Sequence, residues 1–243
     1  MALLEITNVS KRFGGLKAVN DVTFGIERGE MAFMVGPNGA GKTTLFNLIT
    51  GVYPIDSGTI TFDGHDISRI TPDQAARLGI GRTFQIVKPL CNLTVLENVI
   101  LGAFLHTSSS SVAEREAAET LKFLQMEKIV HLPARGLGLA TLKRLEIARA
   151  LATKPKLMLL DEVVAGLPTS EALKLADLLK RLSEWGIAAV GGVEHVMPVV
   201  MKLADRVVVF DHGTLIAEGK PQDVVHLPQV IEAYLGPKYK EVL

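Results

Sequence analysis

Residues 36–44 read Gly36-Pro37-Asn38-Gly39-Ala40-Gly41-Lys42-Thr43-Thr44. This stretch fits the pattern G-x-x-x-x-G-K-[ST], a loop that wraps the phosphates of a nucleoside triphosphate. The apolar run 31–35 before it predicts a buried strand, and residues 44–49 predict the first turns of a helix. A glycine-rich loop in that position points successive backbone N–H groups at an anion. The stretch therefore predicts binding of ATP or GTP, with Lys42 on the β- and γ-phosphates and the Thr43 hydroxyl on Mg²⁺.

The composition is that of a folded protein the size of one large α/β unit. The chain has 243 residues, of which 48% are hydrophobic, so it can bury a sizeable core. Lysine plus arginine and aspartate plus glutamate number 26 each, which argues against a nucleic-acid partner held by bulk charge. The single cysteine, Cys91, excludes an internal disulfide and fits a reducing cytosol.

The sequence predicts neither a transmembrane helix nor a cleavable leader. Its mean hydropathy is +0.29, yet no run of about eighteen uncharged apolar residues occurs. Residues 1–5 include no basic stretch and no apolar segment of the kind that precedes a cleavage site. We therefore expect a cytosolic protein that contacts a membrane only through a partner.

Helices are predicted in the middle of the chain. Thr71 and Thr94 each stand three residues before a glutamine or a glutamate, the pattern of a capping box that begins a helix. The second of these helices should run to about Leu105. The polar run 107–111 predicts a mobile loop, and helical periodicity resumes over 112–126.

Strands are predicted in two groups. Apolar and polar residues alternate near the N-terminus, as in half-exposed antiparallel strands, over residues 4–10, 21–26 and 58–62. The last hundred residues alternate strands with helices, the pattern of a parallel sheet covered by helices. The predicted strands there are 156–160, 187–193 and 206–210, and the predicted helices are 141–151, 170–185 and 197–203.

These patterns predict an α/β fold. It comprises a phosphate-loop NTPase core with a mainly parallel sheet, an N-terminal antiparallel β subdomain and an inserted helical subdomain at about 89–133. The core then consists of residues 1–88 and 134–243, and the whole chain, 1–243, forms a single domain.

Two carboxylates follow the apolar run 157–160. A carboxylate at the C-terminal end of a strand beside the phosphate loop can hold Mg²⁺, and we assign that role to Asp161. Glu162 would then lie next to the γ-phosphate and polarise the attacking water. Acidic residues also end strands without any catalytic role, so this assignment depends on the phosphate loop before it.

Three further residues are weaker candidates on their own. Gln85, between the core and the helical segment, has an amide that can contact Mg²⁺ or the lytic water, although a surface glutamine is the simpler interpretation. His195 follows a predicted buried strand, where an imidazole can donate to the γ-phosphate. Phe13 can stack on adenine, but a lone aromatic residue is more often part of the packing.

The order of the motifs resembles that of the ATP-binding subunits of ABC transporters over residues 3–236. Within that family, the chain is most similar to the subunits of branched-chain amino acid importers. The segments that carry this resemblance are RFGGL at 12–16, TLFNLITG at 44–51, GRTFQ at 81–85, LTVLEN at 93–98, RLEIAR at 144–149 and EAYLG at 232–236.

The resemblance implies an ABC ATPase fold, ATP and Mg²⁺ as cofactors, and a role for each candidate. Phe13 becomes the adenine-stacking aromatic, Gln85 the Q-loop glutamine and His195 the switch histidine. Lys42 and Glu162 complete the catalytic set, with Glu162 as the general base. The implied metal ligands are Thr43, Gln85 and Asp161. The other implied nucleotide contacts are Gly36, Pro37, Asn38, Gly39, Ala40, Gly41, Lys42, Thr43 and Thr44.

The resemblance also implies partners. Transmembrane permease subunits would hold the chain on the inner face of the cell membrane, and a periplasmic or extracellular solute-binding protein would act indirectly. Two ATP-binding subunits of this family close head to tail, with each ATP between one phosphate loop and the other chain's signature segment. No nucleic-acid partner is expected.

The chain departs from the family pattern where it would serve the neighbour's nucleotide. The signature, Leu-Ser-Tyr-Gly-Gln in this branch, is here Leu137-Gly138-Leu139-Ala140-Thr141, so Gly138 replaces the serine and Ala140 replaces the glycine. Losing one hydrogen bond to a charged phosphate costs about 1.5–3 kcal/mol. Pro168 replaces a polar residue of the D-loop, and Val163 stands where proline is usual.

We therefore predict a heterodimer with a different ATPase subunit, in which this chain's own nucleotide site is active and the other is impaired. The alternatives are a homodimer with a tolerant or slow signature, and a sequence that carries debilitating substitutions. Functionally, the sequence predicts the motor of an importer for branched-chain or related small amino acids. The alternatives are a lipid or polysaccharide transport ATPase, a soluble ABC ATPase outside transport, and a nucleotide-binding scaffold without hydrolysis. The transported molecule and the direction of transport are not encoded in these motifs.

Overall fold

Two sheets form the centre of the fold. The computed structural model describes residues 2–183, 187–192 and 197–235. The larger sheet has six strands in the order β10 (Thr214–Gly219), β9 (Arg206–Asp211), β3 (Met31–Val35), β8 (Ala188–Gly192), β7 (Leu157–Asp161) and β6 (Ile80–Arg82). The smaller sheet has four strands in the order β2 (Leu16–Ile26), β1 (Leu4–Phe13), β4 (Ser57–Phe62) and β5 (His65–Asp66).

The six-stranded sheet is parallel except for β10, which pairs antiparallel with β9. Strand β7 shows why its sequence is apolar throughout. Leu157 and Leu159 point into one hydrophobic cluster, and Met158 and Leu160 point into another on the opposite face. Since both faces of a parallel sheet are covered, its inner strands contain hardly any polar residues.

The four-stranded sheet is antiparallel throughout and packs against helix α1 (Lys42–Ile49). Together with one face of the larger sheet, they enclose the smaller hydrophobic cluster, which includes Phe24, Phe46 and Phe210. Helix α2 (Pro72–Leu78) follows this sheet and begins with the predicted capping box of Thr71 and Gln74. The phosphate loop starts directly after β3, and its last residues form the first turn of α1.

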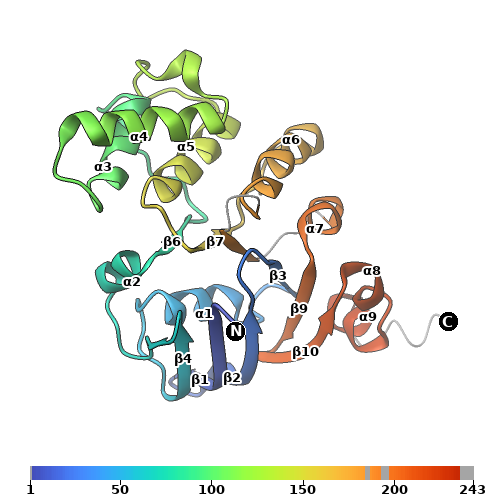
Figure 1. Ribbon diagram of the computed structural model, residues 1–243. Coiled ribbons are helices and arrows are strands. Elements are labelled where there is room, and N and C mark those ends of the chain that lie inside the picture. The colour runs from blue at the N-terminus through green and yellow to red at the C-terminus, as the bar shows by residue number, and fades with distance from the viewer. Residues whose placement is uncertain (1, 184–186, 193–196, 236–243) are drawn as a thin grey trace.

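A helical lobe extends from the sheets (Figure 1). It contains α3 (Val95–Ala103), α4 (Ser110–Phe123), the short 3₁₀ helix η1 (Glu127–Ile129) and α5 (Leu139–Leu151). The helices that follow in the chain lie beside the larger sheet (Figure 1). They are α6 (Thr169–Lys180), α7 (Met197–Leu203), α8 (Pro221–Val224) and α9 (Pro228–Leu235).

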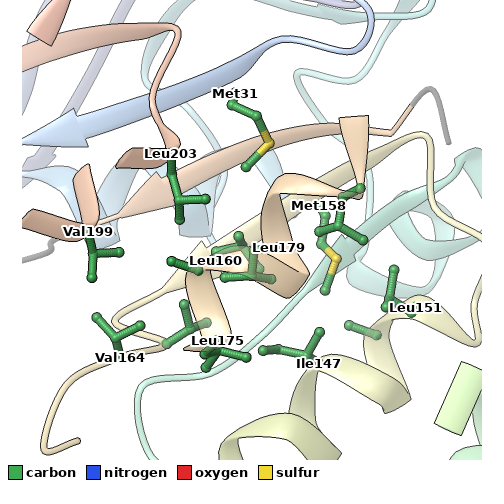
Figure 2. Packing of buried hydrophobic residues seen from close by; sticks show 14 of the residues in the cluster. Met31, Ile147, Leu151, Met158, Leu160, Val164, Leu175, Leu179, Val199 and Leu203 are labelled. Carbon is green, nitrogen blue, oxygen red and sulfur yellow. The ribbon is translucent and has the colours of Figure 1, made fainter. Parts of the chain in front are cut away.

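Helix α5 joins the lobe to the sheet. It packs against α3 and α4 on one side, while Ile147 and Leu151 belong to the same hydrophobic cluster as Met158 and Leu160 of β7. Figure 2 shows these side chains together with others from α6 and α7. Burying one such leucine contributes about 1.5–3 kcal/mol, so the contact stabilises the attachment of the lobe.

The structure confirms most of the predicted elements and corrects several boundaries. The run 107–111 is not a loop throughout, because Ser110 and Ser111 form the first residues of α4. Helix α6 ends at Lys180, short of the predicted end at residue 185. Strands β6 and β10 and the helices α8 and α9 were absent from the sequence prediction.

Candidate functional site

The phosphate loop has a backbone that only glycine can adopt at two positions. Gly41, the N-cap of α1, has a φ of 101°, and a Cβ there would lie 2.3 Å from the carbonyl oxygen of Ala18. Gly36 has a φ of 147°, and a Cβ there would lie 2.1 Å from the carbonyl oxygen of Phe210. The loop therefore curves tightly in front of the N-terminus of α1, where free N–H groups attract an anion.

Lys42 is a buried cation at the mouth of this loop. Its Nζ donates to the carbonyl oxygens of Gly36 and Pro37, at 2.6 Å each. Burial lowers the pKa of Lys42 to about 8, and the nearby carboxylates of Glu162 and Asp161 oppose this decrease. The ammonium group is therefore still mostly charged at neutral pH and can bind phosphate oxygens.

A cavity of about 520 Å³ is lined by most of the predicted nucleotide-binding residues, although Gly36 and Pro37 are not part of its lining. Its size is that of an ordinary small-molecule site. Its lining consists of Phe13, Leu16, Ala18, Asn38, Gly39, Ala40, Gly41, Lys42, Thr43, Thr44, Gln85 and Glu162. Residues from the β1–β2 turn, the phosphate loop and two later segments thus face one space, and their contacts with a nucleotide stay a prediction.

Phe13 lies at the outer end of β1 and is 42% exposed. Its ring meets that of Tyr53 edge to face, with the centroids 5.2 Å apart, and Lys11 Nζ lies 5.6 Å from its centroid. The exposed ring at the rim of the cavity is available to stack on a flat base. Its role toward adenine stays a prediction.

The structure brings Gln85 and Glu162 into direct contact. Gln85 Nε2 donates to Glu162 Oε2 at 2.7 Å. Glu162 follows β7 and has a φ of 50°, which is unusual for a residue other than glycine. Its neighbour Asp161 is buried, and the backbone N–H of Asp161 donates to Thr83 Oγ1 at 3.0 Å. The carboxylates and the amide therefore converge beside the phosphate loop.

Arg82 is a site residue that the sequence analysis missed. Its Nη2 lies 3.1 Å from Asp161 Oδ2, and its Nη1 donates to Asn47 Oδ1 at 2.6 Å. Burial raises the pKa of Asp161, while the hydrogen bond and the charge of Arg82 oppose the increase. Arg82 therefore favours the ionised carboxylate. It is part of the quoted segment 81–85, but nothing local in that segment shows its partner.

The residues proposed to hold Mg²⁺ lie around a second cavity of about 480 Å³, whose lining includes Thr43, Gln85 and Asp161. Among the described residues, no cluster of three or more histidine, cysteine, aspartate or glutamate side chains forms a self-sufficient metal site. One hydroxyl, one amide and one carboxylate suit Mg²⁺, since this ion usually takes its other ligands from phosphate and water.

Gly138 and Pro168 are not part of the lining of these two cavities, and His195 lies outside the described residues. Gly138 is the N-cap of α5 and has no side chain to cap it, and a Cβ at this position would have no atom within 4 Å. Pro168 is the N-cap of α6 and likewise makes no side-chain cap. Both helices thus begin without the polar cap that stabilises many helix N-termini.

The fold and the cavity define a nucleotide-binding ATPase cassette of the phosphate-loop class. Residues 19–165 match the profile of the family described as "ABC transporter", and residues 214–236 match that of "Branched-chain amino acid ATP-binding cassette transporter". The chain belongs to the ABC transporter family, and it is an ATP-binding, ATP-hydrolysing subunit of that family.

Individual relatives agree with this assignment. A protein of Archaeoglobus fulgidus described as "Probable branched-chain amino acid transport ATP-binding protein LivG" is 37% identical over 254 residues, which cover 100% of this chain and 98% of that protein. The ADP conformation of an ATP-binding cassette of an ABC transporter is similar with a TM-score of 0.88 at 32% identity, covering 97% of this chain and 99% of that chain. A dimeric cassette bound to ADP and phosphate has a TM-score of 0.80 at 27% identity, covering 90% of this chain and 98% of that chain.

Across the part of the chain that the structure describes, no helix has the length and apolarity needed to cross a membrane.

Proposed function

We propose that this chain powers a membrane importer for branched-chain or related small amino acids. The observation that carries the proposal is the single cavity in which Lys42, Gln85 and Glu162 face the phosphate loop. The choice of amino acids is supported by the profile matched at 214–236 and by the names of the relatives.

In the proposed reaction, water attacks the γ-phosphate in line, and the protein contributes mainly positioning and charge. Lys42 binds the phosphate oxygens, and Glu162 accepts the proton of the attacking water. Gln85 orients that water through the contact that it makes with Glu162. Mg²⁺, held by Thr43 and Asp161, would neutralise charge on the phosphates when bound. His195 remains our candidate for a further hydrogen bond to the γ-phosphate.

Permease subunits are the expected membrane partners, and a groove beside the helical lobe offers a surface on which they can dock. This groove, of about 360 Å³, lies between the core and the lobe, and its lining includes Val52, Phe84 and Leu101. These side chains are exposed and apolar. A helical segment with an apolar face, presented by a permease, would bury this surface. Such docking would keep the chain on the inner face of the membrane and place the segment that contains Gln85 beside the permease.

The second ATP-binding subunit is proposed to be a different protein. Gly138, Ala140 and Pro168 alter the segments that would serve the neighbour's nucleotide, while Lys42, Asp161 and Glu162 are retained for this chain's own. A partner with an intact signature would complete one active composite site. A homodimer would instead contain two sites with the altered signature.

Purification from membranes tests the proposal. The tagged chain is isolated from detergent extracts, and the copurified chains are identified; the reconstituted complex is then assayed for ATP-dependent uptake of leucine. We expect permease subunits, a second ATPase and uptake of leucine. Permeases of a lipid or polysaccharide system would support the first alternative, and recovery of soluble partners alone would support a role outside transport.

A further inference from the structure

Helix α5 contacts the segment that contains Gln85 through one row of charged side chains. Lys143, Glu146 and Arg149 are spaced three residues apart, so they lie on neighbouring turns of the helix. Lys143 Nζ lies 3.4 Å from the carbonyl oxygen of Gln85, and the N–H of Phe84 donates to Glu146 Oε1 at 3.3 Å. Farther along, Arg149 Nη1 donates to the carbonyl oxygen of Lys88 at 3.0 Å. The helix therefore binds the backbone of residues 84–88 at three points.

Lys143 also reaches the proposed general base. Its Nζ donates to the backbone carbonyl oxygen of Glu162 at 2.8 Å. Lys143 is only 4% exposed, so this cation is removed from water and its contacts with carbonyl oxygens replace hydration.

The backbone of Glu162 makes this contact significant. With a φ of 50°, Glu162 is in the left-handed region, which a residue with a Cβ occupies only when its surroundings hold it there. Its carbonyl oxygen accepts from Lys143 and from the N–H of Ala165, the latter at 3.2 Å. The same ammonium group thus contacts the backbone of both residues whose side chains meet at 2.7 Å.

We propose that Lys143 is a positioning residue that sets Gln85 and Glu162 relative to each other and ties both to the helix that begins at the signature segment. This inference rests on the catalytic roles proposed above for Gln85 and Glu162. Because the N-terminus of α5 would face the nucleotide of the other subunit, a displacement of α5 would move the backbone of this chain's own catalytic residues. The link provides a physical route between the two ATP sites of the dimer.

The test compares three variants of the complex purified from membranes. Lys143→Met keeps the length of the side chain but removes the charge and all hydrogen bonds. Lys143→Arg restores a cation. Lys154→Met is the matched control, because Lys154 Nζ pairs with Glu116 Oε1 at 2.6 Å just beyond the end of α5 and makes no ion pair with a site residue in the described part of the chain. Turnover, ATP affinity, thermal stability and amide hydrogen exchange are measured for each variant, and Glu162→Gln is measured alongside as the reference for loss of the general base.

We expect Lys143→Met to lower kcat about tenfold or more while KM and ATP affinity change less than about threefold, since positioning affects the reacting geometry more than binding. Amide exchange should accelerate over residues 84–88 and 162–166, and Lys143→Arg should recover most of the turnover. Lys154→Met should change none of these quantities.

The inference is overturned if Lys143→Met leaves kcat and exchange at the wild-type level while Glu162→Gln abolishes turnover. It is also overturned if all three variants lose turnover only in proportion to their loss of thermal stability. Should Glu162→Gln itself leave turnover intact, the proposed catalytic roles fail first, and exchange over 162–166 still decides whether Lys143 holds that backbone.

Discussion

At the scale of single residues, the chemistry of the site depends on charges held in partly buried positions. Lys42 binds loop carbonyls, and Arg82 pairs with Asp161, so each charge has a partner before any phosphate arrives. Burial without such partners would be costly. Burial lowers the pKa of Lys42 to about 8, so its ammonium group is charged at neutral pH but loses its proton just above it, and a pH dependence follows from this.

Nucleotide binding should weaken as the pH rises above about 8, the pKa of Lys42 in the protein. The protonated ammonium binds phosphate and the neutral amine does not, so binding above this pH requires uptake of a proton. We expect the Kd for ATP to increase about tenfold between pH 7 and pH 9. The measurement is made by calorimetry in the presence of a chelator, so that no metal ion affects the charge balance. Lys42→Arg is the control and should show a nearly constant Kd, because arginine remains charged over this range. A wild-type Kd that does not change with pH would contradict the account.

At the scale of elements, helix α5 is packed into the core along its C-terminal half and is exposed at its N-terminus. Its body is anchored by Ile147 and Leu151 in the main hydrophobic cluster. Its N-terminus begins at the exposed Gly138, which offers no hydroxyl to cap the helix or to contact a phosphate. The open space around Gly138 shows that a larger residue fits there, since its φ of −67° suits any side chain.

Restoring the signature should therefore activate the second composite site. The double change Gly138→Ser and Ala140→Gly returns the hydroxyl and removes the Cβ near the helix N-terminus. It is measured in a Glu162→Gln background, so that the remaining turnover comes from the partner's phosphate loop. One regained hydrogen bond to a charged phosphate corresponds to an increase in that turnover of about tenfold or more. Arg135→Ser, at an exposed position just outside the signature, is the control. No increase in the double variant would mean that Gly138 and Ala140 are not what limits this site.

At the scale of the whole molecule, α5 and the segment 84–88 join the lobe to the core. The groove between the lobe and the core is lined by exposed apolar side chains, among them Phe84 and Leu101. A permease docked there would contact the lobe and the segment that contains Gln85 at the same time. Leu101 lines the groove but neither of the two site cavities, so a change there can disturb docking without touching the nucleotide site.

Leu101→Asp should impair docking without affecting nucleotide binding. Leu101 is 50% exposed and lines the groove, so a carboxylate there costs little in the free protein but would be desolvated against an apolar partner. We expect recovery of permease subunits in the pull-down to fall at least about tenfold. Leu132→Asp is the matched control, because Leu132 is 48% exposed and does not line the groove. Equal recovery with both variants would exclude the groove as the docking surface.

The sequence predicted the features that depend on neighbouring residues, and it missed those that depend on contacts between residues far apart in the chain. The phosphate loop and the capping boxes of Thr71 and Thr94 depend on neighbouring residues, and the structure has the predicted elements there. Strand β6 is only three residues long and is fixed by pairing with β7, so no periodicity shows it. The contacts of Arg82 with Asp161 and of Lys143 with Glu162 join residues far apart in the chain, and no local pattern encodes them.

The central claim is that this chain hydrolyses ATP at its own phosphate loop with Glu162 as the general base. The most direct measurement is the steady-state ATP turnover of the purified complex, with Glu162→Gln in this chain and, separately, the matching substitution in the second ATPase subunit. We predict that Glu162→Gln lowers turnover about a hundredfold or more, the usual contribution of a general base, while the partner's substitution has a much smaller effect. Nearly unchanged turnover with Glu162→Gln, together with loss of turnover from the partner's substitution, would contradict the account.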